Sequence, residues 1–238
     1  MTGTATAATP PTANPGASSD AAAWASTGDH IIQVRYATPR PLRHPAPGTP
    51  RPMTRWSFEH GDLLDAPADV LVCSANPFLT LSGGVGGAYA MRHGRSMQRQ
   101  LDDWLAASGK RWAPRGTLVE LTPEPGGPGG PGGPGGDSTP PPYARVLHAV
   151  AVDGMYDSSV EVVRGLVERS LAAAAAAGGR SVALAALATG YGHLSLEAFG
   201  EAVRPLVAGG APGEAVDRVT VVVPDAAGAA RARSSARA

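Results

Sequence analysis

The sequence predicts an α/β fold whose mostly parallel sheet is covered by helices on both faces. Short runs rich in β-branched residues alternate along the chain with longer stretches that have the apolar periodicity of helices. Alternation of strands with helices is typical of a parallel sheet. Two of the runs, VALAAL at 182–187 and VTVVV at 219–223, are apolar almost throughout, as expected of strands buried on both faces.

The predicted elements follow one another in regular order. Strands are expected at 55–59, 69–73, 117–121, 145–152, 181–187 and 218–223, and helices at about 85–93, 95–107, 159–177 and 195–207. The third helix is expected to have Ser159 as its N-cap and to end at Gly178 and Gly179. Ser195 is expected to open the fourth helix. A further strand at 31–36 is expected to pair with the strand at 55–59 at the sheet edge.

Composition sets the limits of the folded unit. Residues 1–29 are mostly small or polar and include no Arg or Lys, which predicts a disordered N-terminal tail. The proline-rich stretch 38–52 is expected to form a loop, and 123–142, with its repeat GGPGGPGGPGG, an insertion in a surface loop. The folded domain is therefore expected at 30–225, followed by a flexible C-terminal tail at 226–238.

The charge balance and the lack of long apolar runs exclude several classes of protein. The chain has 20 basic and 20 acidic residues, so its net charge is zero. A general nucleic-acid binder usually carries a basic excess or stripe, so nucleic acid is not expected as a partner. No run approaches the roughly 18 apolar residues of a membrane span, and residues 1–29 lack the features of a secretory signal. We therefore expect a cytoplasmic monomer with no membrane association.

Two residue types occur only once, and each limits the chemistry. Cys73 is the only cysteine, which excludes an intrachain disulfide and a multi-cysteine zinc site. We expect Cys73 to pack within a strand, and we expect neither a metal nor a cofactor. Lys110 is the only lysine, so a mechanism with a lysine nucleophile would have to use it.

Asn76 lies between the apolar run 69–73 and a glycine-rich turn, SGGVGG, at 82–87. A strand that delivers an amide into such a turn predicts a ligand site. The alternative is that Asn76 and Pro77 only form a turn, because both residue types are common in turns. Glycines at 82–87 allow a phosphate to approach closely, and the free amides at the start of the next helix favour an anion. The spacing is neither a Rossmann fingerprint nor a Walker loop, since Tyr89 stands at the third glycine position and no lysine follows.

A second glycine-rich loop, TGYGH at 189–193, also follows a predicted strand and precedes a predicted helix. Two such loops can close on the two halves of a diphosphate. Within this loop, Tyr191 is either an aromatic wall of the site or a structural residue. Asp62 follows another strand, where its carboxylate either accepts hydrogen bonds from an exocyclic amine or supports a turn.

The histidines do not predict a catalytic triad. His148 lies inside the predicted strand at 145–152, so a hydrogen-bonded core histidine is expected there. His93 and His193 have no Asp or Ser partner at a recognisable spacing.

Taken together, four segments resemble the macro domain family of ADP-ribose-binding modules. They are GDLL at 61–64, DVLVCSANPFL followed by SGGVGGAYAMRHG within 69–94, RVLHAV at 145–150, and VALAALATGYGHLSLEAF at 182–199. The resemblance covers about residues 52–225. It implies a three-layer α/β/α fold with a mixed, mostly parallel sheet that binds ADP-ribose at the strand ends.

The resemblance also implies a role for each loop. Asp62, with Leu63 beside it, would hold the adenine, and Asn76 would contact the distal ribose. The diphosphate would lie between Gly83, Gly84, Val85 and Gly86 on one side and Thr189, Gly190, Tyr191 and Gly192 on the other. The first Asn of the family's usual Asn-Ala-Ala-Asn stretch is replaced by Cys73 or Ser74, depending on the alignment. Asn76 is therefore the candidate catalytic residue.

Departures from the family pattern bear on catalysis. One branch of de-ADP-ribosylating enzymes has an Asp and a His where this chain has Gly86 and Ala90, and another uses a lysine in the first glycine loop, far from Lys110. Two functions stay open. One is an ADP-ribosyl hydrolase or ADP-ribose 1''-phosphate phosphatase that relies on Asn76, orientation and electrostatic stabilisation. The other is a non-catalytic reader, and the expected partner is ADP-ribose or an ADP-ribosylated protein.

Overall fold

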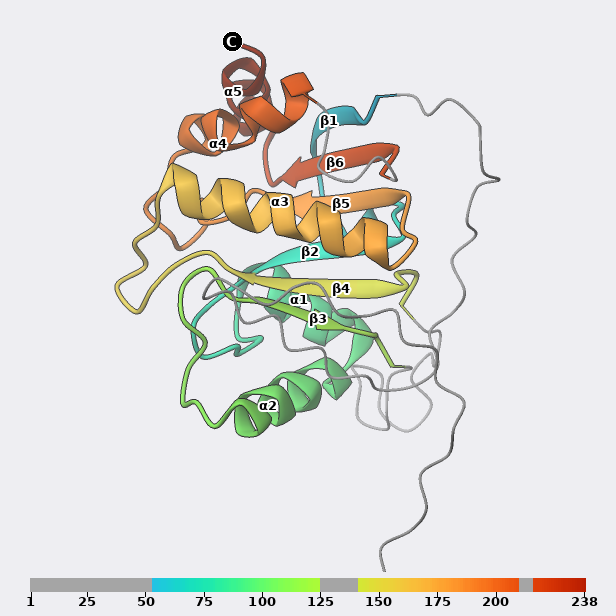
Figure 1. Cartoon of the computed structure of the whole chain (residues 1–238), viewed down its shortest axis with the longest axis vertical. Helices are drawn as coiled ribbons and strands as arrows, with labels where there is room; N and C mark the ends of the chain where they lie inside the picture. Colours follow the sequence, from blue (N-terminus) through green and yellow to red (C-terminus); the bar gives the residue numbers. More distant parts are fainter. Residues whose placement is uncertain (1–52, 125–140, 210–215) are drawn as a thin grey trace, which may run out of the picture.

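Six strands form one sheet in the order β1-β6-β5-β2-β4-β3 (Figure 1). Neighbouring strands are parallel, except that β3 is antiparallel to β4. The strands are β1 (Arg55–His60), β2 (Val70–Ala75), β3 (Leu118–Leu121), β4 (Arg145–Val150), β5 (Ser181–Ala185) and β6 (Arg218–Val223). Each overlaps a strand expected from the sequence, so the predicted mixed, mostly parallel sheet is confirmed.

The computed structural model describes residues 53–124, 141–209 and 216–238. The predictions for 1–29, 31–36 and 38–52, and most of the predicted insertion at 123–142, lie outside these residues. In the described part, no helix is both long and apolar enough to cross a membrane.

Helices cover both faces of the sheet. The helices are α1 (Gly84–His93), α2 (Ser96–Ser108), α3 (Val160–Ala176), α4 (Leu196–Gly209) and α5 (Ala226–Arg237), with a short 3-10 helix, η1 (Leu63–Asp65), after β1. In Figure 1, α3 lies in front of the sheet and α1 lies behind it. The three-layer α/β/α architecture is therefore confirmed.

The predicted ends of α3 and α4 agree with their hydrogen bonds. The hydroxyl of Ser159 accepts a hydrogen bond from the Val162 amide at 3.3 Å, as an N-cap does. The helix ends before Gly178, whose φ of 80° lies in the left-handed region. Ser195 accepts a hydrogen bond from the Ala198 amide at 3.1 Å at the start of α4.

The predicted flexible tail at 226–238 is wrong, because these residues form α5 and pack on α4 and β1. The carboxylate of Asp225 caps the helix by accepting a hydrogen bond from the Gly228 amide at 2.7 Å. A Cβ atom on Gly200 of α4 would lie 2.5 Å from the carbonyl oxygen of Ala232, so the two helices approach closely. Small side chains allow this contact, and Ala232 is fully buried although α5 has little apolar character.

The core centres on β2, and the sheet brings the loops of interest to one edge. Residues 70–73 of β2 are completely buried. At the start of β2, the carboxylate of Asp69 accepts hydrogen bonds from the amides of Arg180 and Ser181, at 2.9 and 3.0 Å, and so joins β2 to β5. Since β1, β6, β5, β2 and β4 run parallel, their carboxyl ends share the opposite edge.

His148 lies in the core, as predicted, with 1% of its surface exposed. The expectation that hydrogen bonds satisfy it is not met, since neither ring nitrogen has a partner within the described part of the chain. Burial lowers the pKa of its imidazole to about 4. His148 is therefore a neutral core residue rather than a group of the site.

Candidate functional site

Among the described residues, the non-glycine positions with a strained backbone lie in the loops after β2, β4 and β5. Leu79, Tyr156 and Ala188 have φ values of 54°, 64° and 63°, and among the described residues they are the non-glycine ones with positive φ. One lies in each of the three loops at the carboxyl edge of the sheet. Strain of this kind persists where the surrounding structure enforces it, and it clusters at ligand sites. A ligand site is therefore expected at this edge of the sheet.

The first glycine-rich loop leads directly into α1. Gly83 is the N-cap of α1, which has no side-chain cap and no acidic residue in its first turn. Gly84 has a φ of 54°, which favours glycine. Gly86 is buried, and a Cβ atom there would lie 3.0 Å from the Leu81 side chain. The start of α1 thus offers free amides with an open approach at Gly84, as an anion site requires.

The second glycine-rich loop contacts the first. The hydroxyl oxygen of Tyr191 lies 3.1 Å from the position that a Cβ atom on Gly83 would occupy. A Cβ atom on Gly192 would lie 2.2 Å from the carbonyl oxygen of Ala188, so the turn requires glycine there. Thr189 is fixed by donating a hydrogen bond from its hydroxyl to the Ala186 carbonyl at 2.8 Å. Tyr191 is 75% exposed, so its ring forms a wall over the first loop while remaining open to solvent.

Asn76 uses its whole side-chain amide inside its own loop. The Nδ2 atom donates hydrogen bonds to the carbonyl and hydroxyl oxygens of Thr80, at 2.9 and 3.0 Å. The Oδ1 atom accepts from the backbone amides of Phe78 and Thr80, at 3.0 and 3.3 Å. These bonds use both donors and both acceptor positions of the amide. Asn76 thus acts as a turn former in this structure, which is the second of the two interpretations that its sequence context left open.

Asp62 is engaged on both carboxylate oxygens. Its Oδ1 atom accepts a hydrogen bond from the Leu64 amide at 2.9 Å, and its Oδ2 atom lies 2.8 Å from an amino nitrogen of Arg92 in α1. The other amino nitrogen of Arg92 lies 2.6 Å from Asp65. The hydrogen bond to Asp65 raises the pKa of Arg92, with smaller contributions from the charges of both carboxylates. Asp62 therefore supports a turn and an ion pair, while 42% of its side chain stays exposed.

The other predicted site residues differ in their exposure. Leu63 is 4% exposed, so its side chain belongs to the core and only its backbone can reach a ligand. Val85 is half-buried in the first turn of α1, and Gly190 is exposed in the second loop. Cys73 is fully buried, and burial raises the pKa of its thiol to about 12, so it packs in β2 as predicted.

The sequence did not predict a hydrogen bond between His193 and Asp157, whose Nδ1 and Oδ1 atoms lie 2.9 Å apart. His193 ends the second glycine-rich loop, and Asp157 lies in the loop after β4. Nearby, Asp153 accepts hydrogen bonds from the amides of Met155 and Asp157 and pairs with Arg115 at 2.9 Å, which orders this loop. The sequence feature that could have indicated this pair is the segment DGMYD, which places two aspartates directly after the strand RVLHAVAV.

His93 is not part of this pair. Its ring packs against Tyr89 with the ring centroids 4.8 Å apart, and its Nε2 atom is buried without a partner within the described residues. Burial, and secondly the charge of Arg92, lower the pKa of His93. His93 therefore has a packing role in α1.

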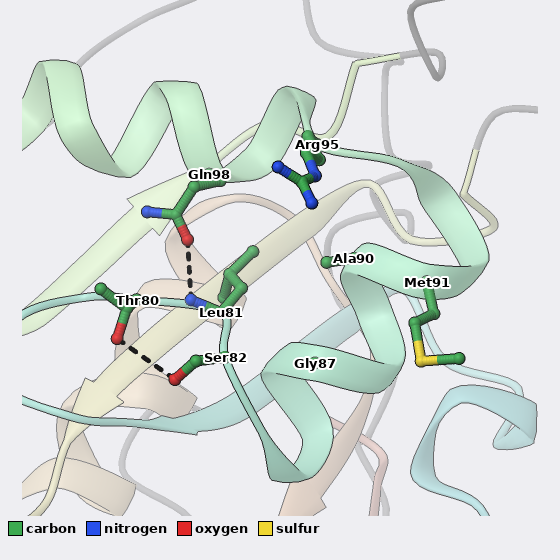
Figure 2. A pocket seen from close by; sticks show the side chains of 8 residues that line it. All are labelled: Thr80, Leu81, Ser82, Gly87, Ala90, Met91, Arg95 and Gln98. Carbon is green, nitrogen blue, oxygen red and sulfur yellow. Dashed lines mark hydrogen bonds between the residues drawn. The ribbon is translucent and has the colours of Figure 1, made fainter. Parts of the chain in front are cut away.

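A cavity of about 530 Å³ lies beside the first glycine-rich loop (Figure 2). It is lined by Thr80, Leu81, Ser82, Gly87, Ala90, Met91, Arg95 and Gln98. The first three lie in the segment before α1, and the next three lie in α1. Arg95 directly precedes α2, and Gln98 lies in its first turn. None of them comes from the second glycine-rich loop, so this cavity is distinct from the contact between the two loops.

Known proteins resemble this chain in structure. No protein-family model matches the sequence, and no curated protein matches it. A Trypanosoma brucei macrodomain in complex with ADP is 17% identical over 76% of this chain and 67% of that chain, with a TM-score of 0.55. The Oceanobacillus iheyensis macrodomain with ADP is 16% identical over 74% and 86%, with a TM-score of 0.58. The Trypanosoma brucei macrodomain in complex with ADP-ribose is 19% identical over 74% and 67%, with a TM-score of 0.52.

These structural likenesses, each with a TM-score above 0.5, extend over about three quarters of the chain. The chain therefore has the macrodomain fold.

Proposed function

We propose that the protein binds ADP-ribose at the carboxyl edge of the sheet, between the two glycine-rich loops. The observation that carries this proposal is the contact of Tyr191 with Gly83, which brings the two loops together. Solved macrodomains in complex with ADP and ADP-ribose support the choice of ligand. A diphosphate would then lie against the free amides at the start of α1, where the helix dipole favours negative charge.

The remaining parts of the ligand follow from the same placement. The adenine would lie beside Asp62, whose exposed carboxylate can accept a hydrogen bond from the exocyclic amine while it keeps Arg92. The distal ribose would lie beside the loop that Asn76 closes. In this proposal Asn76 fixes the shape of the loop, and a direct contact with the ribose would require it to give up a bond to Thr80.

Calorimetry with free ADP-ribose tests the binding. We expect an affinity in the micromolar range, which corresponds to about 8 kcal/mol. Asp62→Ala should weaken binding, and Asp217→Ala is a control that removes an ion-paired carboxylate beside the opposite edge of the sheet, near the start of β6. A folded protein that gives no heat with ADP-ribose at high concentration would contradict the proposal.

Two biological roles fit a protein that binds ADP-ribose. A reader would bind ADP-ribosylated proteins without turnover, and the absence of an acid or base at Gly86 and Ala90 favours this role. A hydrolase would remove ADP-ribose from acidic side chains or process small derivatives. The pair of His193 and Asp157 favours this second role, because a carboxylate at Nδ1 orients an imidazole for proton transfer at Nε2.

In the hydrolytic role, a water oxygen would bond to C1'' of the distal ribose while the bond from C1'' to the carboxylate oxygen breaks. His193 would accept the proton of the water, and the acidic side chain would leave as a carboxylate. Asp157 would stabilise the imidazolium that forms.

A further inference from the structure

The cavity beside the first glycine-rich loop is lined by one arginine side chain and by no carboxylate. Of its lining residues, Arg95 alone carries a charge. Its guanidinium is exposed and has no hydrogen bond or ion pair within the described part of the chain. By contrast, Arg92 in the same region is held by Asp62 and Asp65. In Figure 2 the side chain of Arg95 extends from the start of α2 into the space above Leu81.

The other polar lining groups are fixed in place. Gln98 accepts a hydrogen bond from the Leu81 amide at 2.7 Å and donates to Asp102 at 2.8 Å, so its amide holds the wall. The hydroxyls of Thr80 and Ser82 lie 3.4 Å apart on the facing side. The apolar part of the wall comes from Leu81, Ala90 and Met91. The volume falls within the range of small-ligand pockets.

The cavity shares its wall with the Asn76 loop. The hydroxyl of Thr80 lies 3.0 Å from Nδ2 of Asn76, and the same hydroxyl reaches Ser82. One hydrogen-bonded unit therefore connects the cavity with the residue beside which the distal ribose is placed. A group attached to that ribose would have the cavity as its neighbouring space.

We propose that this cavity is an anion subsite in which Arg95 binds a phosphate or carboxylate carried next to the distal ribose. The proposal rests on the proposed binding of ADP-ribose. The guanidinium can hold either anion with two parallel hydrogen bonds, and the Ser82 hydroxyl can donate a third. The apolar wall would contact the atoms that join the anion to the ribose. Arg95 would thus select nucleotides with a substituted distal ribose over free ADP-ribose.

Titration of the full chain with inorganic phosphate, and separately with glutamate, tests the subsite by itself. We expect the amide NMR signals of Ser82, Gly87 and Ala90 to shift, and the stronger of the two titrations identifies the preferred anion. Arg95→Gln should weaken this binding about tenfold or more, since hydrogen bonds to charged groups are among the strong ones. Arg99→Gln removes an exposed charge one turn further along α2 and should leave it unchanged.

Measuring the affinity of the wild type and of Arg95→Gln for two nucleotides tests whether the subsite takes part in nucleotide binding. Free ADP-ribose should bind equally to the wild type and to Arg95→Gln, whereas ADP-ribose 1''-phosphate, which carries the anion on the distal ribose, should bind the variant about tenfold more weakly. No shift of the cavity signals with either anion, or an equal loss in Arg99→Gln, would overturn the subsite. A shift that depends on Arg95 in a protein that does not bind ADP-ribose would support the anion site and contradict the proposed function.

Discussion

The hydroxyl oxygen of Tyr191 lies 3.1 Å from the position that a Cβ atom on Gly83 would occupy, so the two glycine-rich loops are in contact there. Gly83 has an extended backbone with a φ of −169°, which any residue can adopt. A side chain at this position would therefore meet the tyrosine ring rather than strain the backbone.

Gly83→Val should push Tyr191 away and open the gap between the loops. We expect the affinity for ADP-ribose to fall about tenfold or more, which is about 1.4 kcal/mol, while the melting temperature changes little. Gly209→Val at the end of α4 is the control, because nothing lies within 4 Å of a Cβ atom there. Binding of ADP-ribose to Gly83→Val at the wild-type affinity would show that the contact does not shape the site.

Asn76→Ala should destabilise the protein, because it leaves the amides of Phe78 and Thr80 and the Thr80 carbonyl without their partner. Because these groups are exposed and water can replace the lost bonds, the expected loss in the free energy of unfolding is only about 0.5–1.5 kcal/mol, measured by urea denaturation. Asn76→Asp keeps the acceptor for the two amides but sets a carboxylate oxygen against the Thr80 carbonyl oxygen, so it should also destabilise the loop. A variant with unchanged stability that no longer binds ADP-ribose would instead make Asn76 a direct ligand contact.

Stability should depend on pH through His148. Its folded pKa of about 4 lies below the ordinary value of 6.5, so the unfolded chain binds the proton more tightly. The contribution of His148 is therefore complete above pH 6.5 and is lost as the pH falls toward 4, by about 3 kcal/mol in total. His148→Leu should remove this part of the acid sensitivity, whereas substitution of the exposed His60 by Gln should not. Identical acid denaturation curves for His148→Leu and the wild type would contradict the assignment.

Gly200→Ala should loosen α5, because the added methyl would lie 2.5 Å from the Ala232 carbonyl. We expect a loss of about 1–3 kcal/mol in the free energy of unfolding, as for other overpacked contacts, and faster proteolysis after residue 225. Gly209→Ala, which meets nothing within 4 Å, is the matched control in the same helix. If Gly200→Ala is as stable as this control, α5 does not pack tightly.

Loss of labelled ADP-ribose from an auto-modified ADP-ribosyltransferase separates the two roles. If the protein is a hydrolase that uses the His193 and Asp157 pair, His193→Gln should slow release at least about tenfold, in the range that general base catalysis contributes. Binding of ADP-ribose should stay the same in this variant. Unchanged label in the presence of the wild-type protein supports the reader.

The sequence predicted the sheet and four of the helices because these elements have strong local signals. The apolar runs at β2, β5 and β6 are buried on both faces, and Ser159 and Gly178 mark the ends of α3. Helix α5 has no such signal, since its stability depends on the close approach of Gly200, which is a property of the packed helices. Single-sequence patterns do not contain this information.

Some features of the candidate site could also be predicted from the sequence, whereas others depend on how the loops fold. The two glycine-rich loops could be singled out from the sequence because glycine lets a phosphate approach the backbone closely, and Gly84 does adopt a left-handed φ of 54°. The pair of His193 and Asp157 was missed because 36 residues separate the partners and two different loops bring them together. The choice between the two roles of Asn76 depended on the positions of the Thr80 atoms, which the sequence does not specify.

The antiparallel register of β3 with β4 determines where residues can be inserted between these two strands. Leu121 pairs with Val146, so residues on either side of the stretch 125–140 are held at neighbouring positions. Since β3 is antiparallel, this connection joins the sheet at the edge opposite the two glycine-rich loops. The entropy of closing a loop grows slowly with its length, by only about 0.6 kcal/mol for each doubling. An affinity tag placed in this stretch should therefore leave ligand binding undisturbed.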